Sequence, residues 1–260
     1  MMGMESHIIP SPLKVDEVDA PAIEVSRLRM SFGDRVVLDD FNLIVRKDEN
    51  VVILGKSGAG KSVLIKCVIG LLTPDSGEIN VLGQSVLGLR HIELDRIRTK
   101  IGFLFQGNAI YDSMSVRENL EFPLRRHWFD LTQQQIDAMV TEALQNVELL
   151  NTIDMMPDEL SGGMLKRIAL ARTMILKPDI ILYDEPTTGL DPVTARDIDA
   201  LIVSLHRKYH TAAIIISHDM KCVKNTSDRV VLLLDGKCYA EGLYEAFENS
   251  SDENIKQFFE

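Results

Sequence analysis

Short apolar runs separate the longer polar stretches of the chain and predict a buried sheet. The runs are VVIL, IGFLF, IILY, AAIII and VVLLL, at residues 51–54, 101–105, 180–183, 212–216 and 230–234. Each has the length of a strand and is bounded by polar or glycine residues, which is typical of strands buried on both faces of a parallel sheet. Helical patterns lie between the runs, so the sequence predicts an α/β core.

Residues 23–47 show a different pattern, in which apolar and polar side chains alternate. The apolar positions include Leu28, Met30, Phe32, Phe41, Leu43 and Val45. A period of two with one polar face indicates antiparallel strands that cover the edge of the core. The segment TPDSGEINVLG, at residues 73–83, adds a turn and a short strand to this layer.

A third region, from about residue 107 to residue 160, contains no apolar strand run and predicts helices inserted between two core strands. Thr132 and Gln135 form a capping-box pattern at the start of one of these helices. One helical stripe follows, made of Ile136, Met139, Val140, Ala143, Leu144 and Val147.

Composition narrows the class of protein. The chain has 260 residues, 45% of them hydrophobic and 26% charged, which is ordinary for a globular protein with a buried core. Its net charge of −11 argues against a nucleic-acid partner. The three cysteines lack metal-ligand spacing and are expected to be small buried side chains in a reducing compartment. No apolar run reaches the length of a membrane span, and residues 1–22 are predicted to be a flexible, acidic tail.

The segment GKSGAGKS, residues 55–62, fits the pattern of a loop that binds nucleotide phosphates, G-x-x-x-x-G-K-[ST]. It follows an apolar run and precedes a helical pattern, as this loop requires. Its glycines let main-chain N–H groups converge on phosphate oxygens, while Lys61 can neutralise charge and Ser62 can bind Mg²⁺. The predicted nucleotide-binding residues here are Gly55, Lys56, Ser57, Gly58, Ala59, Gly60, Lys61, Ser62 and Val63.

Polar residues at the ends of three other apolar runs predict the rest of a catalytic site, because carboxyl ends of parallel strands meet at one edge of a sheet. Asp184 is the expected Mg²⁺ partner and Glu185 the expected general base. His218 is expected to contact the terminal phosphate, and Gln106 to reach Mg²⁺ or the attacking water. The alternatives are that the two acids cap the helix that begins near residue 186 and that the histidine is structural.

The order and spacing of six motifs resemble the nucleotide-binding subunits of ATP-binding-cassette (ABC) transporters. These motifs are the loop at 55–62, FLFQ, LSGGM, LYDEP, GLD and ISHD, and the resemblance covers residues 23 to about 235. It implies an α/β fold with a P-loop core, an antiparallel β-subdomain and an inserted helical subdomain, and ATP and Mg²⁺ as cofactors. It also implies that Phe32 stacks on adenine; the alternative is that Phe32 is only an apolar sheet residue.

The LSGGMLKR segment, residues 160–167, is a second glycine-rich turn that opens a helix. In the family that this chain resembles, two subunits pair head to tail. Ser161, Gly162 and Gly163 of one copy then hold the γ-phosphate bound by the other, and Asp191 lies across the interface. Only one G-x-x-x-x-G-K-S pattern exists in the chain, so a homodimer is the simplest expectation.

Met164 stands where most of the family has Gln or Glu, so a ribose contact should be missing. Signature loops with this methionine resemble the Mla-type, Mce-associated lipid-transport ATPases. FPLRRH (122–127) and the ending NIKQFFE fit that branch, whereas FQGNAIY (105–111) replaces its usual FQSGALF. The resemblance implies ATP-driven lipid transport at the cytoplasmic face of a bacterial inner membrane, with a permease, an Mce-type protein and a small regulatory subunit as partners. Other ABC systems and soluble ABC ATPases are the alternatives.

The expected domain limits follow from these assignments. Residues 1–22 form the N-terminal tail, residues 23–240 the ATPase domain and residues 241–260 a short C-terminal tail. The helical subdomain is expected at about residues 107–172.

Overall fold

A seven-stranded, mainly parallel sheet forms the centre of the computed structural model, which describes residues 7–8, 20–126 and 130–259. Of the expected tail at residues 1–22, residues 7–8 and 20–22 lie within these ranges, and the rest lies outside them. The strand order is β1 (His7–Ile8), β11 (Lys237–Gly242), β10 (Arg229–Leu234), β4 (Asn50–Leu54), β9 (Ala212–Ile216), β8 (Ile180–Asp184) and β7 (Ile101–Leu104). The strands from β10 to β7 pair in parallel, and β11 pairs antiparallel with β10. The five apolar runs are therefore confirmed as strands of an α/β core.

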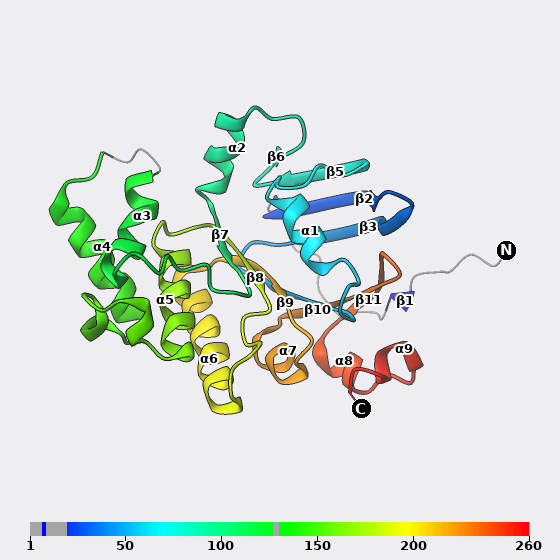
Figure 1. Ribbon diagram of the computed structural model, residues 1–260. Helices are drawn as coiled ribbons and strands as arrows, with labels where there is room; N and C mark the ends of the chain where they lie inside the picture. Colours follow the sequence, from blue (N-terminus) through cyan, green and yellow to red (C-terminus); the bar gives the residue numbers. More distant parts are fainter. Residues whose placement is uncertain (1–6, 9–19, 127–129, 260) are drawn as a thin grey trace.

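A second, four-stranded antiparallel sheet lies beside the first, at the upper right of Figure 1. Its order is β3 (Arg35–Val45), β2 (Ile23–Phe32), β5 (Ser76–Val81) and β6 (Gln84–Ser85). The inward residues of this sheet pack in one core with α1 (Lys61–Val68), α2 (His91–Arg98) and one face of the central sheet. Burial alternates along β2 and β3, as the period of two predicts.

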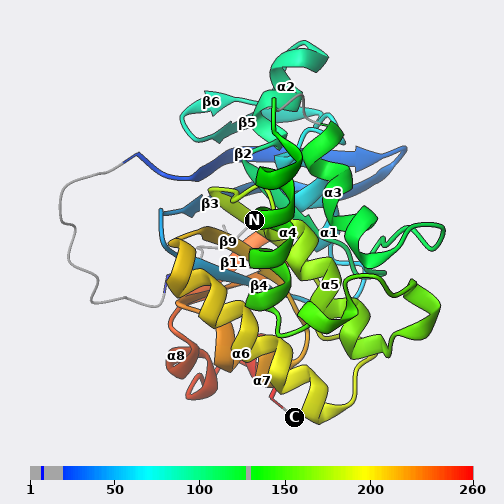
Figure 2. The ribbon, with the colours of Figure 1, turned by 90° about the vertical axis from the view of Figure 1, so that its left-hand side faces the viewer.

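The inserted helices lie at the opposite end of the molecule, at the left of Figure 1 and toward the viewer in Figure 2. They are α3 (Val116–Arg126), α4 (Gln133–Asn146) and the short turns η1 (Leu150–Thr152) and η2 (Pro157–Glu159). Thr132 caps α4, and its Oγ1 accepts a hydrogen bond from the N–H of Gln135. The apolar stripe of α4 packs against α3 and α5 (Gly162–Met174), so the predicted helical subdomain is present.

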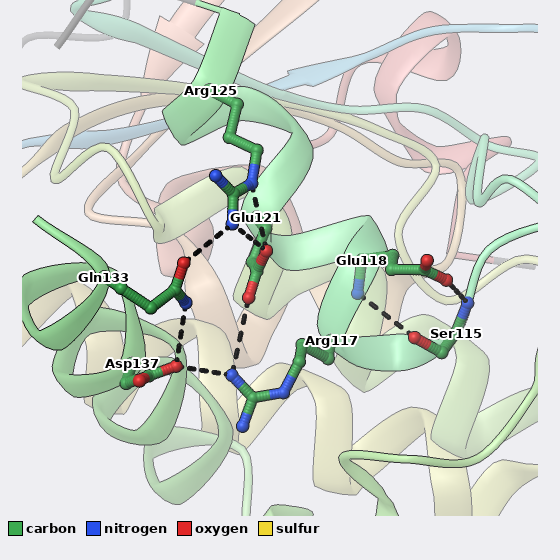
Figure 3. A network of polar contacts seen from close by, with 7 residues as sticks. All are labelled: Ser115, Arg117, Glu118, Glu121, Arg125, Gln133 and Asp137. Carbon is green, nitrogen blue, oxygen red and sulfur yellow. Dashed lines mark hydrogen bonds and ion pairs between the residues drawn. The ribbon is translucent and has the colours of Figure 1, made fainter. Parts of the chain in front are cut away.

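A network of polar contacts on α3 reaches α4, as Figure 3 shows. The carboxylate of Glu121 is only 10% exposed and accepts hydrogen bonds from Arg117 and Arg125, at 3.4 and 2.7 Å. Arg117 also donates to Asp137 of α4 at 2.6 Å. Glu121 and both arginines belong to α3, so its buried carboxylate fixes the two guanidinium groups, and these in turn reach Asp137 and Gln133 of α4.

The remaining helices cover the other face of the central sheet. They are α5, α6 (Pro192–Tyr209), α7 (Met220–Thr226), α8 (Tyr244–Glu248) and α9 (Glu253–Lys256). The last two pack Tyr244, Phe247 and Ile255 into the core. Over the described residues, every helix is too short or too polar to cross a bilayer. This arrangement leaves the carboxyl ends of β4, β8 and β9 open at one edge, where the motif residues meet.

Candidate active site

The glycine-rich loop between β4 and α1 wraps around its own lysine. Lys61 Nζ donates to the main-chain oxygens of Gly55 and Lys56, at 2.6 and 3.1 Å. Gly60 has φ of +109°, and a Cβ there would lie 2.8 Å from Val37 Cγ1, so the close turn requires glycine. Burial lowers the pKa of Lys61, while the carboxylates of Glu185 and Asp184 act in the opposite direction. An anionic ligand stabilises the charged form of an ammonium group in such surroundings.

Ser62 and Asp184 form the next part of the site. Ser62 Oγ, at the start of α1, donates to Asp184 Oδ1 at the end of β8, at a distance of 3.0 Å. Burial raises the pKa of Asp184, and the hydrogen bond from Ser62 partly offsets that rise. A half-buried carboxylate of this kind is stabilised by a cation.

Glu185 follows β8 in a left-handed conformation, with φ of +52°. Its main-chain N–H donates to Ile216 O of the neighbouring strand β9 at 3.0 Å, which holds this turn in place. The Glu185 side chain is 13% exposed, and its Oε2 lies 2.8 Å from His218 Nδ1. Thr188 Oγ1 donates to the same oxygen at 3.1 Å. A strained main chain with a fixed, nearly buried carboxylate is typical of a functional site.

One pocket brings most of the predicted residues together. Its lining includes Phe32, Ser57, Gly58, Gly60, Lys61, Ser62, Val63, Gln106, Asp184, Glu185 and His218. Phe32 is 50% exposed at the end of β2, which suits a side chain that stacks on a ligand rather than one that fills a core. The carbonyl oxygens of Gly55 and Lys56 accept hydrogen bonds from Lys61 Nζ. Ala59 packs against the core beneath the loop.

The pocket also contains residues that no sequence motif predicts, namely Arg35, Val37 and Ile216. Arg35 Nη2 donates to the main-chain oxygen of Gly58 at 3.3 Å. Arg35 and Val37 belong to the antiparallel sheet, and only its packing against the loop places them in the pocket. The alternating pattern of β3 carries no signal for this contact.

The second glycine-rich turn lies away from this pocket, and its residues do not line it. Ser161 caps α5, and its Oγ accepts from the N–H of Met164 at 3.3 Å. A Cβ on Gly162 would meet nothing within 4 Å, whereas a Cβ on Gly163 would lie 2.7 Å from Thr194 Cγ2. Asp191 caps α6 by accepting from the N–H groups of Val193 and Thr194. Within one chain, therefore, the two glycine-rich turns do not share a ligand.

The donor set of the pocket fits Mg²⁺. A serine hydroxyl and a carboxylate oxygen lie 3.0 Å apart, and Gln106 adds an amide to the same pocket. Mg²⁺ prefers hard oxygen ligands and is usually held by one or two carboxylates together with substrate phosphates.

A phosphate-binding loop after β4, a histidine after the neighbouring strand β9 and an acid pair at the end of the next strand, β8, define an ATPase of the P-loop class. Residues 38–188 match the ABC transporter family, and the chain belongs to that family. It is an ATP-binding and ATP-hydrolysing subunit, with the α/β cassette fold that the motifs predict.

Two relatives of the chain carry different functional names. The chain is 40% identical to the intermembrane phospholipid transport system ATP-binding protein MlaF of Haemophilus influenzae, over 91% of this chain and 89% of that protein. It is 38% identical to the probable ribonucleotide transport ATP-binding protein mkl of Mycobacterium leprae, over 91% of this chain and 68% of that protein. Among solved structures, the dimeric ATP-binding cassette MJ0796 bound to ADP and Pi superposes with a TM-score of 0.77 at 29% identity, covering 85% of this chain and 98% of that one.

Proposed function

We propose that this ATPase drives the movement of phospholipid or a related lipid in the bacterial cell envelope. One observation carries the choice of substrate: 40% identity along 91% of the chain to a protein named for phospholipid transport. Met164 in the second glycine-rich turn supports the same lipid-transport branch of the family. The ribonucleotide transport named for the mycobacterial relative is the second candidate, because that identity is nearly as high, at 38%.

We propose a role for each of the pocket residues. Lys61 and the main-chain N–H groups of the loop hold the β- and γ-phosphates, and Phe32 stacks on adenine. Ser62, Asp184 and Gln106 would hold Mg²⁺, which supplies positive charge to the leaving phosphate when bound. Glu185 accepts the proton of the attacking water, and His218, 2.8 Å from it, orients that carboxylate and reaches the γ-phosphate.

Two copies of the chain are proposed to close around two ATP molecules. Ser161, Gly162 and Gly163 would contribute N–H groups and a helix N-terminus to the γ-phosphate held by the partner copy. The open space at Gly162 supports this role, because nothing in its own chain requires glycine there. Asp191 would lie across the same interface.

The transport partners are proposals that accompany the lipid assignment. They are an integral-membrane permease, an Mce-type lipid-binding protein and a small regulatory subunit. The chain itself would lie at the cytoplasmic face of the inner membrane, bound through the permease.

Reconstitution tests the proposed substrate. The chain and the permease that co-purifies with it would be placed in vesicles that contain fluorescent phospholipid. ATP-dependent lipid movement that Glu185→Gln abolishes supports the proposal. Transport of a labelled ribonucleotide in place of lipid would support the second candidate, and lipid movement without ATP would contradict the first.

A further inference from the structure

The loop that carries Gln106 is held by side chains of α5. Arg172 Nη2 donates to the main-chain oxygens of Asn108 and Ala109, at 3.2 and 2.8 Å. Lys166 Nζ donates to the main-chain oxygen of Gln106 at 3.0 Å. Three hydrogen bonds therefore connect the loop to the helix that begins at Gly162.

This loop has an unfavourable main-chain conformation. Asn108 and Ala109 are consecutive left-handed residues, with φ of +61° and +53°. Asparagine tolerates this region better than most residues, but alanine rarely adopts it, and such a residue persists only when its surroundings hold it. Among the described residues, Asn108 Oδ1 is also buried without a hydrogen-bond partner. The N–H groups of Asn108 and Ala109 bond within the loop, to Phe105 O and Gly107 O, whereas their carbonyl oxygens accept from Arg172, outside it.

Both donors are charged; Lys166 is buried and Arg172 is partly buried, with its contact to Ala109 at an exposed position. Lys166 is 2% exposed, and burial lowers the pKa of both Lys166 and Arg172. Hydrogen bonds from charged donors are stronger than neutral ones, and burial strengthens the contact of Lys166 with Gln106 further. Loss of either donor would leave main-chain oxygens without their partner.

We propose that Arg172 and Lys166 are positioning residues that keep Gln106 facing the phosphate pocket by holding its loop in the left-handed form. Because both lie on α5, the place of Gln106 then follows any movement of the helix whose first residues form the second glycine-rich turn. The two nucleotide-contacting ends of one chain would thus be mechanically connected. This inference rests on the proposed role of Gln106 at the phosphates.

Arg172→Lys tests the proposal, because lysine keeps the charge but is shorter and lacks the planar group whose Nη2 donates to both loop oxygens while Nη1 donates to Asn119 Oδ1. We expect kcat of the full chain to fall about tenfold and KM for ATP to stay within about twofold, since Lys61 and its loop are untouched. Ala109→Gly in the same chain should restore much of kcat, because glycine adopts the left-handed conformation without the cost that Arg172 offsets.

Arg98→Lys is the matched control. Arg98 Nε and Nη2 donate to the main-chain oxygens of Ile69 and Gly70, both at 3.0 Å, and so hold a loop that is not part of the pocket. The control should leave kcat unchanged, and the thermal unfolding of both variants would be compared. A kcat loss in Arg172→Lys that exceeds the control at equal thermal stability supports the proposal.

Several results would overturn it. An unchanged kcat in Arg172→Lys, an equal rise in KM, or no recovery with Ala109→Gly would each show that Arg172 does not position Gln106. Gln106→Ala separates this inference from the proposed function. If that variant keeps the full rate, the role of Gln106 itself is wrong; if it is slow while Arg172→Lys is not, only the positioning role fails.

Discussion

Replacement of Gly162 by alanine distinguishes a site completed by a second copy from one complete within a single chain. Gly162 is the first residue of α5, and an added Cβ would have no neighbour within 4 Å. Alanine is the better helix former, so Gly162→Ala should stabilise the isolated chain by about 0.5 kcal/mol. This corresponds to a rise in Tm of about 1–2 °C.

The same substitution should damage ATP hydrolysis. If the N–H groups of Ser161–Gly163 contact the γ-phosphate on the partner copy, the new methyl group would lie between donor and phosphate. A displacement of about 1 Å at such a contact can lower the rate about 100-fold. ATP binding to the isolated chain should be unchanged, because Gly162 does not line its pocket.

Gly163→Ala provides the contrast. Its Cβ would lie 2.7 Å from Thr194 Cγ2, about 1 Å inside normal contact, and Thr194 cannot readily turn because its hydroxyl donates to Asp191. Overpacking of this kind costs about 1–3 kcal/mol, so Tm should fall. The assays are thermal unfolding, equilibrium ATP binding and steady-state hydrolysis. Full hydrolysis by Gly162→Ala, or a loss of stability equal to that of Gly163→Ala, would refute the reasoning.

Three further substitutions test individual roles. Lys61→Ala should weaken ATP binding at least about tenfold, because the phosphates lose their ammonium partner; unchanged affinity by calorimetry would contradict this. Glu185→Gln should bind ATP normally but hydrolyse it about 100-fold or more slowly, and should accumulate as a closed dimer in size-exclusion chromatography with ATP; near-normal turnover would exclude Glu185 as the base. Thr132→Ala should lower the free energy of unfolding by about 1 kcal/mol through loss of the α4 cap, with ATP affinity unaffected. Denaturant titration measures this change, and an unchanged free energy of unfolding would contradict the role of the cap.

The central strands could be predicted because strands buried on both faces must be apolar throughout, and β4 is buried at all five of its residues. The run at 101–105 is one residue too long as a strand, since β7 ends at Leu104. Phe105 is 40% exposed and packs edge-on against Phe103, at 4.1 Å between ring centroids. An aromatic residue beyond a strand has the same sequence signal as one inside it.

The site was predictable where strand ends supply its residues. Glu185 and His218 are 33 positions apart, yet β8 and β9 are neighbours, so their side chains meet. Contacts between separate layers were not predictable. Arg35 reaches Gly58 from the antiparallel sheet, and Lys166 reaches Gln106 from α5, and neither contact follows from periodicity or motif spacing.

The close approach of Gly163 to Thr194 joins the tip of α5 to the first turn of α6. Asp191 caps that turn and accepts from Thr194, so the tip of α5 packs directly on a capped helix start. A neighbouring subunit that pressed on either segment would shift both at once. The second glycine-rich turn and the start of α6, which are distant in the sequence, would therefore be displaced together. Release of a nucleotide from a contact with either segment would change the position of both.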